Sequence, residues 1–286
     1  MKRCCLFFFL MFFPICSVYS EVRTCASLKD YFGSIELQEG DLVVFDIDGT
    51  LLAVQEPAID DALFKKHWET LTQLTEWTPV LKEVVGNLTV RCPMMLIELE
   101  TPKVIADIQR QGISVVALTA CQSFPYGDKE TPRFRFEQLG DMGMHLSDPL
   151  HQEGMIEFDE QDRVMGYFPS YYHGVIVSNP WFFGPAGVNE KGPVLRSFIQ
   201  RLPEPPKRVI FCDDVQRNLT SVEAALTEMG IAFEGCYYVG ADGIERQSVS
   251  IERFKEVWSA LIDKARALIA TTPSLSDENM CMESNK

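Results

Sequence analysis

Four short runs of apolar residues recur along the chain, and each has the length of a β-strand rather than of a helix. Within each run most successive residues are apolar, so both faces of the strand would be buried. Strands of this kind are typical of a parallel sheet that is covered on both sides. The four predicted strands are residues 42–46, 113–119, 207–212 and 231–239.

Amphipathic stretches with helical spacing separate these strands. In residues 101–111, Thr101 is expected to cap the helix and Pro102 to occupy its first position. A longer stretch, residues 58–86, carries apolar residues at helical spacing and is expected to end at Gly86. Further helices are predicted at residues 131–140, 190–201, 216–229 and 250–269.

This alternation predicts a doubly wound α/β fold around a parallel sheet. Residues 54–98 are long for a connection, so we expect a small helical cap there. Residues 152–178 carry shorter, β-like runs punctuated by glycine, which predicts a β-hairpin insert. We therefore expect one α/β domain over residues 21–270, followed by a polar, flexible tail over residues 271–286.

Residues 1–20 have the three-part pattern of a secretory signal peptide. Lys2 and Arg3 precede an uncharged, phenylalanine-rich run that continues to Cys16, and small residues precede a cleavage site after Ser20. The alternatives are a retained membrane anchor, for which the run is short, and lipidation of Cys16. We expect an exported protein that is periplasmic or secreted and that leaves the membrane once the signal is removed.

Export would permit disulfide bonds, but cysteine spacing does not give their pairing. No CxxC pair or Cys/His cluster indicates a zinc site. Cys212 lies within an apolar strand, so a buried thiol is expected there. The cysteines that would remain after removal of the leader are Cys25, Cys92, Cys121, Cys212, Cys236 and Cys281.

The chain is acidic, with a formal net charge of −15, and loss of Lys2 and Arg3 with the leader would make it more so. This balance argues against nucleic acid or an anionic membrane as the main partner. An acidic substrate remains compatible with it, because a bound metal reverses the field inside a pocket.

Polar residues follow three of the predicted strands. Because the carboxyl ends of parallel strands meet at one edge of a sheet, these side chains should converge. Clustered carboxylates repel one another, and a divalent cation with oxygen ligands resolves the conflict, which favours Mg²⁺. Lys191, at the start of a helix, could neutralise the remaining charge. The residues that follow the strands are Asp46, Asp48, Thr119, Asp213 and Asp214.

These motifs resemble the four motifs of the haloacid dehalogenase (HAD) superfamily. DIDGTL follows an apolar strand, a threonine ends the next strand, a lysine comes later, and two aspartates follow a further strand. The leader, NEKG at 189–192, FCDDVQRNL at 211–219 and GCYYVG at 235–240 resemble a group of exported bacterial HAD proteins of unassigned function. One departure is Cys121-Gln122, where related sequences often carry a basic residue.

The resemblance implies a role for each residue. Asp46 would be the nucleophile that forms an aspartyl-phosphate, and Asp48 the general acid and base. Thr119 would bind a phosphoryl oxygen, and Lys191 would hold the nucleophile. The metal ligands would be Asp46, the backbone carbonyl of Asp48, Asp213 and, either directly or through water, Asp214.

Asp48 also bears on the reaction type, because a halide leaving group needs no proton and the dehalogenating branch lacks this second acid. We therefore expect an exported, Mg²⁺-dependent phosphatase that hydrolyses a small phosphomonoester. One alternative is a secreted, non-catalytic binding or effector protein that keeps the metal site. Another is a phosphotransferase with an acceptor other than water.

The acidic residues also have structural interpretations. Asp46 and Asp48 would form an acidic turn, with Gly49 as the turn residue and Thr50 capping a helix. Asp213 and Asp214 would cap the helix that follows them.

The other candidates have simpler interpretations too. Thr119 would be an ordinary strand residue and Lys191 a surface lysine, with Lys129 as a competitor for the catalytic role. The aromatic residues between 167 and 183 would pack the insert against the core or line a pocket.

Overall fold

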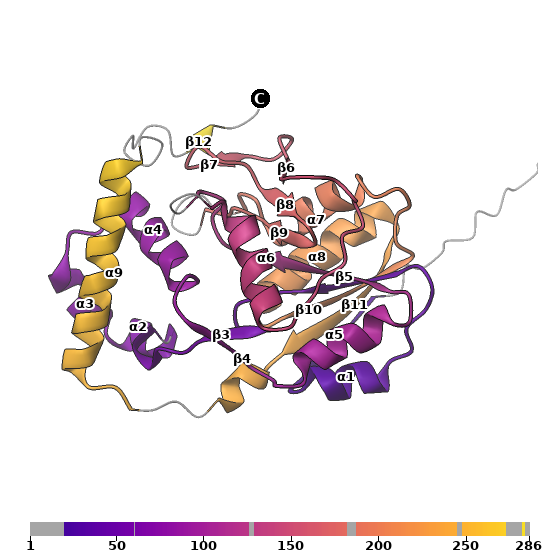
Figure 1. Cartoon of the computed structure of the whole chain (residues 1–286), viewed down its shortest axis with the longest axis horizontal. Coiled ribbons are helices and arrows are strands. Elements are labelled where there is room, and N and C mark those ends of the chain that lie inside the picture. Colours follow the sequence, from indigo (N-terminus) through magenta and orange to yellow (C-terminus); the bar gives the residue numbers. More distant parts are fainter. Residues whose placement is uncertain are drawn as a thin grey trace, which may run out of the picture.

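The computed structural model describes residues 20–59, 61–125, 129–181, 187–244, 248–272 and 282–283 (Figure 1). The predicted signal peptide up to residue 19, the alternative lipidation of Cys16, and Cys281 lie outside these residues. None of the described helices combines the length and the hydropathy needed to cross a bilayer.

An eight-stranded sheet forms the centre of the fold, in the order β1-β11-β10-β2-β5-β9-β8-β6. The first six strands in this order are parallel, and β8 and β6 continue the sheet in antiparallel pairing. The predicted α/β fold with a large parallel sheet is therefore confirmed. The strands are β1 (Ser20–Cys25), β2 (Asp41–Phe45), β5 (Ser114–Thr119), β6 (Ile156–Glu157), β8 (Ser170–Tyr172), β9 (Val175–Val177), β10 (Arg208–Asp213) and β11 (Ala232–Tyr238).

The two faces of the sheet are covered by different helices. Val43 and Phe45 of β2 pack with α1 and α5, whereas Leu42 and Val44 pack with α7 and α8. Successive strand residues point to opposite faces, so this division follows from the apolar run itself. The helices are α1 (Leu28–Ser34), α5 (Thr101–Gln109), α6 (Thr131–Asp141), α7 (Lys191–Ile199) and α8 (Gln216–Met229).

One detail of α5 differs from the prediction. Its N-cap residue is Glu100, and Thr101 lies inside the helix instead of capping it. Pro102 consequently occupies the second helical position, which tolerates a missing N–H as well as the first does.

The edge strand β1 was not predicted, because it reads SEVRTC and lacks an apolar run. It pairs with β11 in parallel and is joined to it by a disulfide bond between Cys25 and Cys236. Cys212 carries the buried free thiol that its strand predicts.

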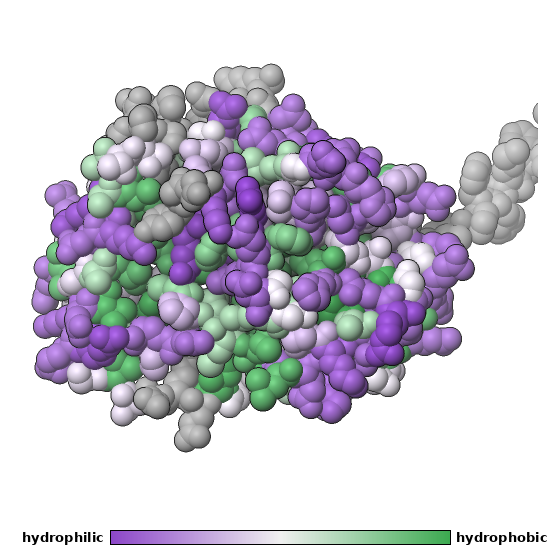
Figure 2. Space-filling view, viewed as in Figure 1, coloured by the Kyte–Doolittle hydropathy of each residue, from purple (hydrophilic) through white to green (hydrophobic). Residues whose placement is uncertain are grey.

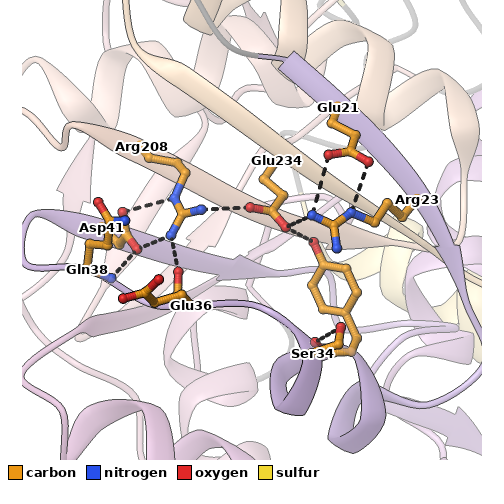
Figure 3. Close-up of polar contacts among 9 residues, drawn as sticks. Glu21, Arg23, Ser34, Glu36, Gln38, Asp41, Arg208 and Glu234 are labelled. Atoms are coloured by element: carbon orange, nitrogen blue, oxygen red, sulfur yellow. Dashed lines mark hydrogen bonds and ion pairs between the residues drawn. The ribbon is translucent and has the colours of Figure 1, made fainter.

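A network of charged side chains joins four strands of the sheet (Figure 3). Glu234 of β11 pairs with Arg208 at 2.8 Å and with Arg23 at 3.1 Å, and it accepts a hydrogen bond from Tyr31. Arg208 also pairs with Asp41, the first residue of β2, at 2.6 Å. Both oxygens of the buried Glu234 carboxylate are thus paired, which offsets the cost of its burial.

The helical cap is built on an antiparallel pair, β3 (Leu52–Val54) and β4 (Met94–Leu96). The helical stretch predicted over residues 58–86 is four separate pieces, and Gly86 lies inside the last of them. The last piece begins at Pro79 because the Thr78 side chain accepts a hydrogen bond from Leu81 N and Pro79 takes the first helical position. The pieces are η1 (Pro57–Ile59), α2 (Asp61–Lys66), α3 (Trp68–Leu74) and α4 (Pro79–Thr89).

The last helix, α9 (Ile251–Thr271), packs on the cap instead of on the sheet, as Figure 1 shows. Its buried residues Phe254 and Trp258 lie in one cluster with Leu81 and Val84 of α4, and Trp258 Nε1 donates a hydrogen bond to Ala58 O at 2.9 Å. The cap therefore includes chain far from residues 54–98. On this face of the molecule, hydrophobic residues appear in scattered groups among hydrophilic ones (Figure 2).

The insert between β5 and α7 contains the expected hairpin, in which β8 and β9 pair around Gly174. Its strand β9 lies parallel to β5 and so extends the main sheet. A short strand, β7 (Arg163–Val164), pairs with β12 (Met282–Glu283) of the predicted tail. The rest of the tail beyond residue 272 lies outside the described residues.

Two shorter elements complete the fold. The 3-10 helix η2 (Gly240–Gly243) follows β11, and β6 extends the hairpin by pairing with β8. Neither contributes a residue to the site described below.

Candidate functional site

The polar residues predicted at the strand ends meet at the carboxyl edge of the sheet. Asp46 directly follows β2, and Thr119 and Asp213 are the last residues of β5 and β10. β2 lies between β5 and β10. After β2 the chain forms β5 on one side of it, and later forms β10 on the other side. The direction in which strands are added therefore switches at β2, and ligands bind at such switch points in open α/β sheets.

Lys191 lies in the middle of this edge. Its Nζ donates to Asp46 Oδ1 at 2.5 Å and to Asp213 Oδ2 at 2.7 Å, and only 1% of its side chain is exposed. Burial lowers the pKa of Lys191, but the carboxylates of Asp213 and Asp46 outweigh it and the pKa is raised overall. The lysine is therefore a buried, charged partner of both carboxylates, and the interpretation as a surface lysine is wrong.

Gly192 explains how Lys191 reaches this depth. A Cβ at Gly192 would meet Ser221 O of α8 at 2.1 Å. Only glycine lets the first turn of α7 approach α8 this closely. The competitor, Lys129, is instead 44% exposed and pairs with Glu137.

Asp213 is fixed in one orientation by its neighbours. Its Oδ1 accepts from Val215 N at 2.7 Å and from Asn218 Nδ2 at 3.0 Å, while Oδ2 faces Lys191. Val215 is the N-cap residue of α8, and no side chain caps this helix. The interpretation of Asp213 and Asp214 as helix caps is therefore wrong.

Three carboxylates form a candidate cation site. Asp46, Asp213 and Asp214 each offer an oxygen, and these oxygens lie within 4.8 Å of one another. Within the described part of the chain, Asp214 Oδ1 is buried but has no hydrogen-bond partner. Unpaired carboxylate oxygen next to further carboxylates suits a hard divalent cation such as Mg²⁺, so the residues present fit the ion that the sequence suggests.

The pKa values of these carboxyl groups reflect their burial first and their crowding second. Burial raises the pKa of Asp46 well above its ordinary value, Lys191 opposes this rise, and the neighbouring carboxylates add to it. Burial and the charge of Asp213 raise the pKa of Asp214 to about 6, against the opposing effect of Lys191.

Gly49 brings the loop after β2 against Asp214. It has a φ of +87°, and a Cβ there would meet Asp214 Oδ2 at 2.3 Å. No helix follows, and Thr50 Oγ1 is buried without a hydrogen-bond partner among the described residues. The segment around Gly49 is a turn, as that interpretation has it, but β3 and not a helix comes directly after it, so the interpretation of Thr50 as a helix cap is wrong.

Asp48 has different partners from Asp46. Thr119 Oγ1 donates to its Oδ2 at 3.1 Å, and Arg135 Nη2 donates to its Oδ1 at 2.5 Å. The Asp48 side chain is 32% exposed, in contrast to the buried Asp46. The two carboxylates, two residues apart, thus lie in distinct electrostatic environments.

A pocket of about 320 Å³ opens over these groups. It is of a size to hold a small molecule. Ser178 borders it with a buried hydroxyl that has no hydrogen-bond partner in the described ranges. The residues that line it are Asp46, Asp48, Thr119, Ala120, Ser178, Pro180, Trp181, Gly187, Val188, Asn189, Glu190, Lys191, Asp214, Val215, Arg217 and Asn218.

The aromatic residues of the insert divide between packing and lining. Tyr171 is fully buried and packs on Phe198, whereas Trp181 borders the pocket. Phe182 and Phe183 lie outside the described residues.

Arg135 and Asn218 hold the site but were not assigned roles from the sequence. Asn218 lies five residues after Asp213, so its place on the first turn of α8 was a usable signal. Arg135 gives no such signal, because a helical arginine usually lies at the surface.

Comparison with known proteins identifies a family whose function is unknown. Residues 22–268 match a protein family described as "Protein of unknown function (DUF2608)". The uncharacterized protein RP296 of Rickettsia prowazekii (strain Madrid E) is 20% identical over 206 residues, 71% of each chain. No solved structure matches the chain. Because the match spans most of its length, the chain belongs to the DUF2608 family of proteins of unknown function.

Proposed function

We propose that the protein is a Mg²⁺-dependent phosphatase of the HAD type that hydrolyses a small phosphomonoester. The observation that carries the proposal is the pair of carboxylates Asp46 and Asp48. Both border one pocket, but Asp46 is paired with a buried lysine and Asp48 is held separately at its rim. This division suits a nucleophile and a separate proton donor.

In the first step an oxygen of Asp46 attacks phosphorus, and the bond from phosphorus to the leaving oxygen breaks. Lys191 holds Asp46 Oδ1, so Oδ2 is the attacking oxygen. Asp48 gives its proton to the leaving oxygen, which departs as an alcohol. Thr119 and Lys191 border the same space and contribute hydrogen bonds to the phosphoryl oxygens.

In the second step Asp48 takes a proton from water as the water oxygen attacks phosphorus. The bond between phosphorus and Asp46 breaks, and inorganic phosphate leaves. Asp48 regains the proton that it lost in the first step, so the cycle balances.

The cation would be held by Asp46, Asp213 and Asp214, with the backbone carbonyl of Asp48 as a further ligand implied by the HAD resemblance. Its charge would offset the repulsion between Asp46 and an anionic substrate. Asn218 and Lys191 keep Asp213 oriented for this role.

Export to the periplasm or the medium remains part of the proposal. The leader supports it, and so does the disulfide bond between Cys25 and Cys236, since such bonds persist in oxidising compartments. The acidic chain suits a small phosphorylated substrate better than nucleic acid.

The test is phosphate release from an aryl phosphate by the chain without its leader, with Mg²⁺ and with EDTA. We expect Mg²⁺-dependent release that Asp46→Asn abolishes and that Asp30→Asn, at an exposed position of α1, leaves unchanged. Equal release by wild type and Asp46→Asn would reject the nucleophile.

Two further outcomes select the alternatives. Thermal stabilisation by Mg²⁺ without turnover of any phosphate ester would identify a binding protein. Transfer of phosphate to an added alcohol in preference to water would identify a phosphotransferase.

A further inference from the structure

Arg135 of α6 is a fully buried cation that joins three parts of the chain. Its Nη2 donates to Asp48 Oδ1 at 2.5 Å, and its Nη1 donates to Val90 O at 3.1 Å and to Gln138 Oε1 at 2.7 Å. The Arg135 side chain is 0% exposed, whereas the side chain of Arg133, two residues earlier on the same helix, is 51% exposed.

The contact with Arg135 decides which oxygen of Asp48 faces the pocket. Arg135 is not among the residues that line the pocket, so Asp48 Oδ1, which Arg135 contacts, is held behind the pocket wall. Oδ2 lies beside Thr119, which does line the pocket. The carboxylate is thereby held in one orientation, with Oδ2 toward the space where a leaving group would lie.

The cap in turn determines where Arg135 lies. Val90 is the C-cap residue of α4, and Gln138 Nε2 also donates to its carbonyl at 3.4 Å. Arg91 Nη2 donates to Thr131 Oγ1 at 2.6 Å. The carboxyl end of α4 thus docks on α6 around Arg135, where a cation suits the helix dipole.

We propose that Arg135 is a positioning residue that sets Asp48 for proton transfer to the leaving group and that takes its own position from the end of the cap. This inference rests on the proposed phosphatase activity and deepens it. An unassigned residue on a core helix would then link the cap to the acid that the chemistry needs.

The inference has a chemical signature. An alkoxide leaving group needs a proton as it departs, whereas dinitrophenolate departs without one. Misplacing Asp48 should therefore slow hydrolysis of an alkyl phosphate far more than that of dinitrophenyl phosphate. A loss of folded protein or of metal would slow both equally.

The test compares kcat/KM for an alkyl phosphate and for dinitrophenyl phosphate on the same sample of each variant, with saturating Mg²⁺. Since a positioned acid contributes about 10²- to 10⁴-fold, we expect Arg135→Gln to lower the alkyl-to-dinitrophenyl ratio about 10- to 100-fold. Arg135→Lys should restore part of the ratio. Arg133→Gln, the matched control on the same helix, should leave it unchanged.

A second variant covers the case in which Arg135→Gln does not fold. Gln138→Met removes one acceptor of Arg135 and one donor to Val90, and should lower the same ratio by a smaller factor. A ratio that stays at the wild-type value in Gln138→Met and in every folded Arg135 variant would overturn the inference and leave the phosphatase proposal standing. A wild-type protein that hydrolyses neither ester would overturn both.

Discussion

Lys191 and Asp46 are 145 residues apart in the sequence, yet Lys191 Nζ lies 2.5 Å from Asp46 Oδ1 in the interior of the protein. The same ammonium group contacts Asp213 at 2.7 Å. One cation thus separates two buried carboxylates that would otherwise face each other unpaired.

Replacing this lysine should therefore destabilise the metal-free protein. Removal of one partner of a buried ion pair costs about 3–5 kcal/mol, because the other charge stays buried. We expect Lys191→Met to lower the free energy of unfolding by about this amount in urea titrations with EDTA, with saturating Mg²⁺ restoring part of it.

Lys129→Met is the matched control, since Lys129 pairs with Glu137 at the surface. It should change the free energy of unfolding by less than about 1 kcal/mol. Equal effects of the two substitutions would contradict the described role of Lys191.

Mg²⁺ affinity should rise with pH. The pKa of Asp214 is raised to about 6 and that of Asp46 well above its ordinary value, so the metal-free folded protein keeps protons that the unfolded chain has lost. Raising the pH through about 6 therefore removes stability from the metal-free protein, and Mg²⁺, which needs ionised ligands, restores it.

The measurement is the Mg²⁺-induced rise in melting temperature, which should be larger at about pH 7.5 than at about pH 5. The double variant Asp213→Asn, Asp214→Asn should show no rise at either pH. A rise that does not depend on pH in the wild type would speak against a cation held by these carboxylates.

Gly49→Ala should disturb the cation site, in addition to the loss of stability that its positive φ alone would cause. The added Cβ would lie 2.3 Å from Asp214 Oδ2, so Asp214 must move. Gly154 has the same φ of +87°, but a Cβ there meets nothing within 4 Å.

Both alanine variants should lose about 1 kcal/mol of stability from the strained φ. Only Gly49→Ala should also weaken Mg²⁺ binding, measured by calorimetry. Unchanged Mg²⁺ binding in Gly49→Ala would show that Asp214 is not a ligand.

The charge network of Figure 3 should matter for stability and not for chemistry, because none of its residues lines the pocket and because Asp41 and Arg208 begin the strands at whose other ends the pocket lies. Glu234→Ala leaves Arg208 and Arg23 without their shared partner and should cost about 3 kcal/mol. Glu21→Ala, which removes an exposed partner of Arg23, should cost less than about 1 kcal/mol. Turnover per folded molecule should match wild type in both, and a selective loss of turnover in Glu234→Ala would refute this separation.

The sequence predicted those parts of the fold in which the residues of one segment alone indicate that the segment is buried. The run LVVF in β2 is apolar at every position because both faces are covered, and the same holds for the run VIFC in β10. The edge strand β1 escaped prediction because one of its edges and much of its surface face solvent. For α9 the sequence shows an apolar stripe but not its partner, which is the cap.

The residues of the candidate site likewise divide into those that the sequence predicts and those that it does not. Asp46 and Asp213 could be predicted because parallel strands end at one edge. Arg135 could not, because its burial depends on Asp48 and on the end of α4, both distant in the sequence. A helical pattern alone does not distinguish it from the exposed Arg133.

The central claim is that Asp46 becomes covalently phosphorylated, and trapping that intermediate tests it most directly. Wild-type protein would be mixed with a phosphate-labelled aryl ester, quenched in acid and digested. We predict label on the peptide that contains Asp46, lost on mild alkali and absent from Asp46→Asn. Turnover without label on this peptide, or label on another residue, would contradict the account.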